Sequence, residues 1–182
     1  LMAGDHDYIK EDSFYRTFRW APNVTFFDTE EQRCVEIPEK NIFVYGLSFE
    51  HKEERTPLYD EWKPLNKSGF HVLLAHGGDL SCCPIDFTGL AAAGFDYVAL
   101  GHSHKPHTVC RDKIAYSGSL EPLDRNDLGK HGYIQGEYEN GNVKVRLVPC
   151  ANRSYQNLVL NVDRDTTQYK LEEMLRSEVM RR

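Results

Sequence analysis

The sequence contains no apolar run that approaches the roughly 20 residues of a membrane-spanning helix. It begins without an initiator Met, and residues 1–5 lack the basic segment and apolar core of a secretory signal peptide. We therefore expect no membrane insertion. The start resembles that of a chain entered midway.

Cysteine and excess positive charge are also scarce. The 5 cysteines, an odd number, form neither a disulfide framework nor a C-x-x-C zinc pattern, which favours a reducing, cytoplasmic setting. The adjacent Cys82 and Cys83 are interpreted as two small hydrophobic side chains near the end of a loop, rather than as a redox or metal-binding pair. A formal net charge of −6 argues against a broad basic surface for nucleic acid, but it leaves room for a local stripe of Lys and Arg.

Internal repeats and low-complexity linkers are absent, and 182 residues is a usual size for a domain with one principal core. The chain instead carries short apolar runs rich in Val, Ile, Tyr and Phe, which predict strands. These runs are residues 24–27, 34–37, 42–46, 71–76, 97–100, 113–116, 133–138 and 143–148. Residues 84–93 begin with Pro, carry Asp86 early and stop before Gly94, as a short helix does.

The clearest local prediction is a hairpin, because Asn140-Gly141 separates two alternating runs. Residues 1–150 are expected to form one unit. Residues 151–182 are expected to start a following linker or capping segment, with a strand at 155–162 and an amphipathic helix whose start is signalled by Asp165 and Gln168. The apolar stripe of that helix predicts a core or partner-docking face rather than a cofactor site.

Polar side chains follow three apolar stretches, residues 1–4, 72–75 and 97–101, at the point where each one ends. They are Asp5-His6-Asp7, His76 and His102-Ser103-His104. The carboxyl ends of strands are where sites converge in open sheets, so these side chains are expected to meet. Imidazole and carboxylate donors suit manganese, iron or zinc better than calcium. The other histidines, at 51, 71, 107 and 131, lack this setting and are expected on the surface or in the core.

The ordered set Gly4-Asp5-His6-Asp7, His76-Gly77 and Gly101-His102-Ser103-His104 resembles the second half of the calcineurin-like metallophosphoesterase signature. That family pattern runs D-x-H, G-D-x-x-D, G-N-H-D/E, H, G-H-x-H. Residues 95–107, with 116–121 after them, are similar in particular to the DNA-repair exonucleases of the SbcD type. The resemblance covers roughly residues 1 to 150. It implies an α/β fold, a metallophosphoesterase-type β-sandwich flanked by helices, that lacks its N-terminal strands and helices.

The resemblance also implies roles for individual residues. His76 and His102, with Asp5, would bind one of two divalent metal ions, and His104 would bind the other. Manganese is expected, with iron or zinc as alternatives. His6 would act on the scissile phosphate, oriented by Asp7. DNA is the expected substrate, an SbcC-like SMC ATPase subunit and a second copy of the chain are expected as partners, and no membrane is involved.

Two departures from the family pattern affect this interpretation. The family has Asn where this chain has Asp5, which adds negative charge beside the metal. The D-x-H and G-D-x-x-D motifs would lie before Leu1, so the 182-residue chain alone is expected to be inactive. A calcineurin-like phosphatase or cyclic-nucleotide phosphodiesterase acting on a small substrate is an alternative. A metal- or partner-binding module without catalysis is another.

Overall fold

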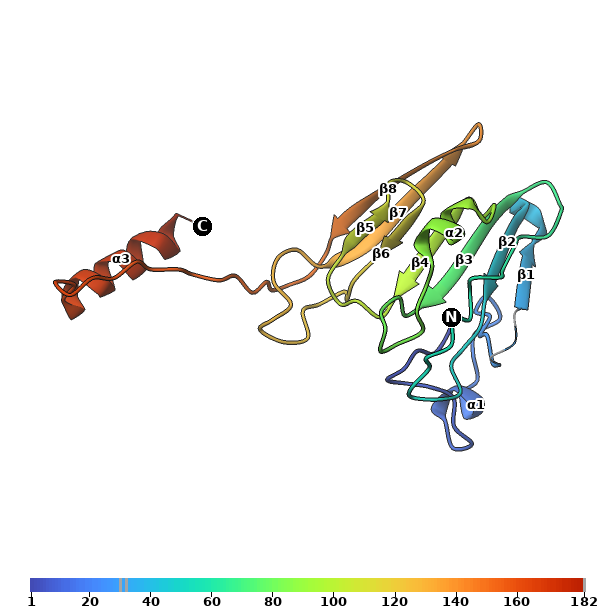
Figure 1. Cartoon of the computed structure of the whole chain (residues 1–182), viewed down its shortest axis with the longest axis horizontal. Coiled ribbons are helices and arrows are strands. Elements are labelled where there is room, and N and C mark those ends of the chain that lie inside the picture. Colours follow the sequence, from blue (N-terminus) through green and yellow to red (C-terminus); the bar gives the residue numbers. More distant parts are fainter. Residues whose placement is uncertain (30, 32, 182) are drawn as a thin grey trace.

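A six-stranded mixed sheet forms the centre of the molecule in the computed structural model, which describes residues 1–29, 31 and 33–181 (Figure 1). The strand order is β1-β2-β3-β4-β6-β5, in which β2, β3, β4 and β6 run parallel and the edge strands β1 and β5 run antiparallel to their neighbours. The strands are β1 (Arg33–Ile37), β2 (Ile42–Gly46), β3 (Phe70–His76), β4 (Tyr97–Gly101), β5 (His107–Cys110) and β6 (Ile114–Tyr116). Parallel strands end at one edge of the sheet, so the segments that follow β3 and β4 meet there.

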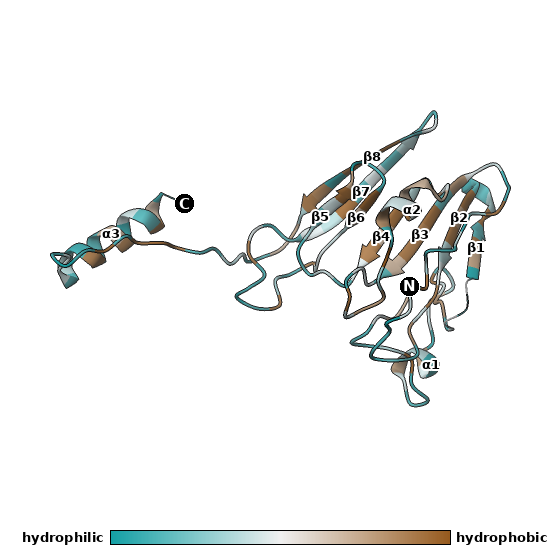
Figure 2. Ribbon diagram, viewed as in Figure 1, coloured by the Kyte–Doolittle hydropathy of each residue, from teal (hydrophilic) through white to brown (hydrophobic). Residues whose placement is uncertain are grey.

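One face of the sheet carries the hydrophobic core. Along β3, His71, Leu73 and Ala75 are buried and alternate with half-buried residues, the period of two that a strand imposes. Helix α2 (Phe87–Ala92) covers this face with the buried side chain of Leu90, and Figure 2 shows hydrophobic residues along β3 and β4. The Asp86 carboxylate caps α2 by accepting the Thr88 N–H at 3.0 Å. The short helix predicted within 84–93 is therefore confirmed.

A two-stranded hairpin, β7 (Gly132–Glu139) and β8 (Asn142–Pro149), lies along the opposite face of the sheet (Figure 1). Its turn is Asn140-Gly141 with φ of 51° and 80°, the positive values that a type I′ turn requires, so this prediction is confirmed. The Tyr138 ring lies 4.4 Å from the Phe70 ring between centroids, and an apolar groove of about 750 Å³ remains between sheet and hairpin. The described residues thus form a mixed α/β structure with a central sheet and few helices.

Two predicted strands are wrong. Residues 24–27 belong to no strand. They make two hydrogen bonds with Leu1, whose amino group donates to the Thr25 carbonyl at 2.7 Å and whose carbonyl accepts the Phe27 N–H at 2.9 Å, and this pairing is too short to form a ladder. Residues 155–162 meet no free strand edge: in the described chain they contribute one isolated bridge, between Leu128 and Tyr155. Both segments are apolar enough to form a strand, but neither has a partner strand to pair with in the described chain.

The predicted final helix is confirmed as α3 (Gln168–Met180), but it begins differently. Its N-cap is Thr167, whose hydroxyl accepts the Lys170 N–H at 3.3 Å, so the expected start at Asp165 is wrong. Figure 1 shows α3 apart from the sheet at the end of an extended segment, and none of its described residues is buried. Two shorter helical turns, α1 (Phe14–Thr17) and η1 (Pro38–Lys40), complete the described elements. None of the helices in the described chain combines the length and apolar character that crossing a membrane demands.

Candidate metal centre

Three segments far apart in the sequence meet at the carboxyl edge of β3 and β4. His76 ends β3 and pairs in register with Gly101, the last residue of β4, so His102 emerges beside it with 5.5 Å between the ring centroids. The N-terminal segment brings Asp5 between them. Its Oδ1 lies 2.7 Å from His76 Nε2 and 3.7 Å from His102 Nδ1. The expected convergence of Asp5, His76 and His102 is present, while their role as metal ligands stays a prediction.

The loop that carries Asp5 is fixed by the backbone and by Asp7. The Asp7 carboxylate accepts the Gly4 N–H at 2.7 Å through one oxygen and the Tyr15 hydroxyl through the other. The hydrogen bond from Tyr15 to Asp7, with burial behind it, raises the pKa of Tyr15 to about 12. Upstream, the Ala3 N–H donates to Ser48 Oγ at 2.8 Å. The structure therefore engages Asp7 in holding the Asp5 loop, where the sequence predicted that it would orient His6.

The His76 ring is wedged between two glycines. A Cβ atom at Gly4 would lie 2.3–2.6 Å from three ring atoms, and one at Gly101 would lie 2.8 Å from Nδ1. Beneath the ring, the His76 N–H donates to the hydroxyl of the fully buried Tyr59 at 3.1 Å, and Phe49 packs edge-on with 5.4 Å between ring centroids. Glycine at both positions is thus required for the ring to reach Asp5.

His102 is held by an aspartate that the sequence reasoning missed. Its Nε2 lies 2.9 Å from Asp79 Oδ2, which leaves Nδ1 as the atom facing Asp5. Asp79 in turn accepts the Ser81 hydroxyl at 2.6 Å and the N–H groups of Ser81 and Cys82 at 2.7 and 2.9 Å. The Ser81 and His102 side chains and these N–H groups hold the pKa of Asp79 well below its usual value. A carboxylate that accepts the second ring N–H of a ligand histidine is a common support in metal sites.

The backbone at His102 has a φ of 95°, a conformation that L residues rarely adopt. Glycine carries no such penalty. We therefore expect the free energy of unfolding of His102→Gly to exceed that of His102→Ala by about 1 kcal/mol, the reverse of the usual order. Both variants lose the same imidazole, so the difference between their free energies of unfolding reports the backbone strain at this position. Urea denaturation in the presence of a chelator measures it. An Ala variant at least as stable as the Gly variant would show that position 102 is unstrained.

The protonation states of Asp5 and His76 favour the binding of a cation. Burial favours a higher pKa for Asp5, but the hydrogen bond from His76 and the charges of His76, His102 and His6 outweigh it and hold the pKa below its ordinary value. Burial lowers the pKa of His76, against the opposing effect of Asp5. Near neutral pH the pair therefore presents an ionised carboxylate and a neutral imidazole, the forms that bind a metal ion.

Cys82 also lies with these residues, although the sequence analysis interpreted it as a small hydrophobic side chain without a metal-binding role. One ligand atom from each of Asp5, His76, Cys82 and His102 lies within 4.8 Å of the other three. Cys82 is 4% exposed. Two imidazoles, a carboxylate and a thiol at this spacing fit a divalent transition metal. In the sequence, the feature that connects Cys82 with the site is its position in the loop that follows His76, a predicted ligand.

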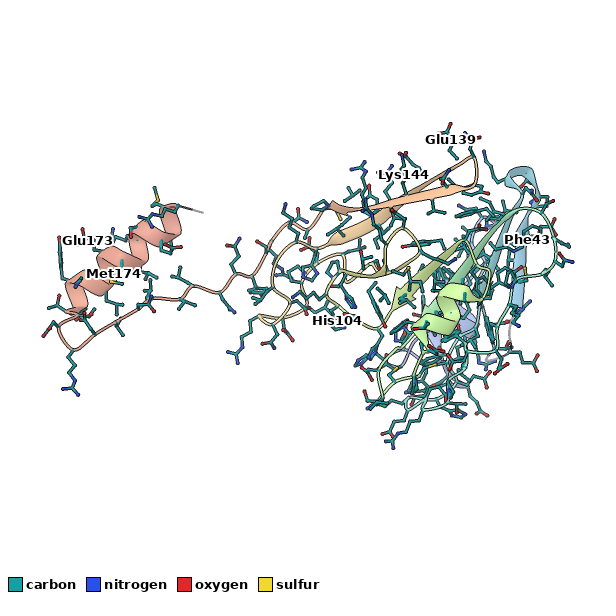
Figure 3. The ribbon with its side chains drawn as sticks, turned by 45° about the horizontal axis from the view of Figure 1, so that its top comes forward. Phe43, His104, Glu139, Lys144, Glu173 and Met174 are labelled. Carbon is teal, nitrogen blue, oxygen red and sulfur yellow. The ribbon has the colours of Figure 1, made fainter. Side chains whose placement is uncertain are left out.

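His104 and His6 lie outside the four-donor group but line the same pocket, which has a volume of about 410 Å³. His104, labelled in Figure 3, has its Nδ1 3.6 Å from Asp127 Oδ2 and its side chain 45% exposed. The His6 side chain is 82% exposed, with Nε2 3.7 Å from Asp5 Oδ2. Among the described residues, one group of three or more donors is assembled, so the ligand set expected for a second ion around His104 is not complete here.

Comparison with known proteins finds similarity to a metallophosphoesterase. No protein-family model matches the sequence. The chain is similar to an uncharacterized metallophosphoesterase, YhaO, of Bacillus subtilis (strain 168), with 24% identity over 158 residues. The aligned part covers 81% of this chain and 38% of the relative. The chain therefore spans well under half of that protein's length. The similarity supports the resemblance to calcineurin-like metallophosphoesterases without distinguishing the SbcD type.

Proposed function

We propose that the chain is the metal-binding part of a metallophosphoesterase that hydrolyses phosphodiester bonds in DNA, in the manner of the SbcD-type exonucleases. One observation carries the proposal: Asp5, His76 and His102 converge at the carboxyl edge of β3 and β4 in the chain order of the family signature. The name of the Bacillus relative supports the coarser part, a metal-dependent phosphoester hydrolase.

A divalent ion bound at this edge would polarise a phosphoryl oxygen and lower the pKa of a water molecule. Asp5, His76 and His102 would hold the ion, and His104 would contribute to a second one. His6 is exposed at the pocket and tethered beside Asp5, a position from which its ring can donate a proton to the leaving oxygen or stabilise charge on the phosphate. Asp7 acts through the loop, because its carboxylate fixes Gly4 rather than the His6 ring.

We further propose that the remaining donors for two-metal chemistry lie outside these 182 residues, in a longer protein. The support is that the described chain assembles one donor group and matches 38% of its relative. The same proposal includes the partners of the chain. The exposed apolar residues of α3, including Leu175 and Val179, would dock an SbcC-like ATPase or a second copy. A cytoplasmic location accords with five free cysteines, two of which are exposed.

DNA is preferred over a small substrate because positive charge adjoins the pocket along the chain. Lys105 follows His104, and Arg125 and Lys130 flank Asp127, the partner of His104; all three basic side chains belong to exposed residues. Such local charge contributes to phosphate binding even when the net charge is negative.

The test compares this chain with a protein extended by the reading frame upstream of Leu1. We expect the extended protein to hydrolyse linear duplex DNA with manganese or zinc and the 182-residue chain to be inactive, because on this proposal the second ligand group is complete only in the extended protein. A His76→Ala version of the extended protein, purified in parallel, controls for contaminating nuclease. Chelator-sensitive nuclease activity of the 182-residue chain, at a rate like that of the extended protein, would contradict the proposal that the chain lacks donors for the second ion. Hydrolysis of cyclic nucleotides or phosphomonoesters but not of DNA would favour the small-substrate alternative.

A further inference from the structure

The loop between β3 and α2 holds Cys82 against the metal centre. The Gly78 N–H donates to the carbonyls of Cys82 and Cys83, at 3.0 and 2.8 Å. Gly77 and Gly78 have φ of 115° and 116°, which glycine adopts far more readily than other residues, and a Cβ at Gly77 would lie 2.6 Å from the Cys82 carbonyl oxygen. The Cys82 N–H donates to Asp79, the residue that holds His102. The loop therefore fixes Cys82 and the His102 ring together.

The two adjacent cysteines face different surroundings. Cys82 Sγ belongs to the group of ligand atoms within 4.8 Å of one another, together with those of Asp5, His76 and His102. Cys83 is fully buried, has a φ of 39°, and contributes no atom to that group in the described chain. Both side chains belong to the hydrophobic core, and of the two only Cys82 also places its thiol in the donor group.

We propose that Cys82 is a ligand of the metal ion held by Asp5, His76 and His102, and that this set selects zinc over manganese. Binding would break the S–H bond, form a sulfur–metal bond and release the proton to solvent. Thiolate is a soft ligand that favours zinc, whereas manganese favours carboxylate, carbonyl and water oxygens. The inference rests on the metal centre proposed above, but it does not depend on phosphoester hydrolysis.

The ligand spacing is compatible with this assignment. Metal–nitrogen and metal–oxygen bonds of about 2.0–2.2 Å and a zinc–sulfur bond of about 2.3 Å put ligand atoms roughly 3.3–3.6 Å apart in a tetrahedron. The largest separation in the group is at most 4.8 Å, so the longest pairs would close by about 1 Å. Burial, then the negative charge of Asp5, raises the pKa of Cys82 to about 12, so without a cation Cys82 is a thiol.

Four protein ligands have a chemical consequence. A tetrahedral zinc ion with three protein ligands keeps a position for water, and a fourth ligand fills it unless the ion expands to five-coordination. Cys82 therefore strengthens retention of the ion and limits its reactivity. Loss of Cys82 should weaken zinc binding at least about 10-fold, the lower end of what the loss of a mere supporting residue causes.

The experiment titrates the metal-free chain with cobalt(II), which reports its ligands by absorption. We expect a near-ultraviolet sulfur-to-cobalt charge-transfer band in the unaltered chain and in the matched control Cys83→Ala. The band should vanish in Cys82→Ala and Cys82→Ser, while the visible cobalt bands of the His and Asp ligands remain. Competition with zinc should show at least a 10-fold weaker affinity for the Cys82 variants and little change for Cys83→Ala.

Two variants at position 82 keep the test decisive if one of them folds poorly, which circular dichroism of the metal-free proteins would reveal. Visible cobalt bands without a charge-transfer band in the unaltered chain would overturn the Cys82 assignment and leave the metal centre intact. So would a charge-transfer band that persists in Cys82→Ala, because another of the free cysteines would then be its source. Failure of the unaltered chain to bind cobalt at all would overturn this inference and the three-residue metal centre together.

Discussion

His76→Ala should abolish metal binding at the Asp5 centre, whereas His6→Ala should keep near-normal metal content and lose roughly 100-fold or more in hydrolytic rate. The distinction follows from position. His76 has its Nε2 2.7 Å from Asp5 and a side chain 18% exposed, in the middle of the donor group. The His6 side chain is 82% exposed and contributes no atom to that group.

Metal content is measured by elemental analysis after dialysis, and the rate is measured with a DNA substrate in the upstream-extended protein. His107→Ala is a matched control, because His107 is an exposed histidine outside the pocket around Asp5. Loss of metal in His6→Ala and its retention in His76→Ala would show that His6 is the metal ligand and that the roles assigned to these two histidines are wrong. Unchanged metal and rate in both variants would refute the phosphoesterase assignment.

Tyr59→Ala should lower the free energy of unfolding by about 3–5 kcal/mol, the usual result of deleting a buried aromatic ring. Tyr59 is fully buried, packs edge-on against Trp62 and accepts the His76 N–H through its hydroxyl. Tyr59→Phe keeps the ring and leaves that N–H unpaired, which costs about 1–3 kcal/mol. The two variants therefore separate packing from the hydrogen bond.

Chemical denaturation of the metal-free proteins gives both values. Tyr169→Ala, on the 79%-exposed tyrosine of α3, should change stability by less than about 0.5 kcal/mol and serves as the control. Because Tyr59 holds the end of β3, Tyr59→Phe should also weaken metal binding. A Phe variant that equals the unaltered chain in stability and affinity would show that the hydroxyl does not position His76.

The strands that build the site were predictable because their patterns are strong and their partners are other strong strands. Residues 42–46 coincide with β2, and 71–76 and 97–100 fall within β3 and β4. Burial on both faces gives such strands continuous apolar runs. Residues 155–162 have a similar composition but meet no free edge in the described chain, and pairing depends on a neighbour that composition does not reveal.

The donor group was predictable only in part, for a similar reason. His76 ends one parallel strand and His102 follows the next, so their positions at strand ends predicted that they would meet. Cys82 and Asp79 lie in a loop, where no periodicity indicates direction, and they reach the site because Gly77 and Gly78 turn the backbone back on itself. The Asp7 contact with Tyr15 likewise depends on the fold of residues 1–29, which the sequence pattern did not specify.

The parallel order of β2, β3 and β4 also determines when the donor group can form during folding. The β7–β8 hairpin joins neighbouring residues through a two-residue turn and can form within microseconds, since little chain entropy is lost in closing it. Asp5 and His76 are 71 residues apart, and their meeting waits for closure of a long loop and for non-local strand pairing. His76 and Cys82, in contrast, flank one short loop. We therefore expect the ligands to assemble in stages, with the full set complete only late in folding.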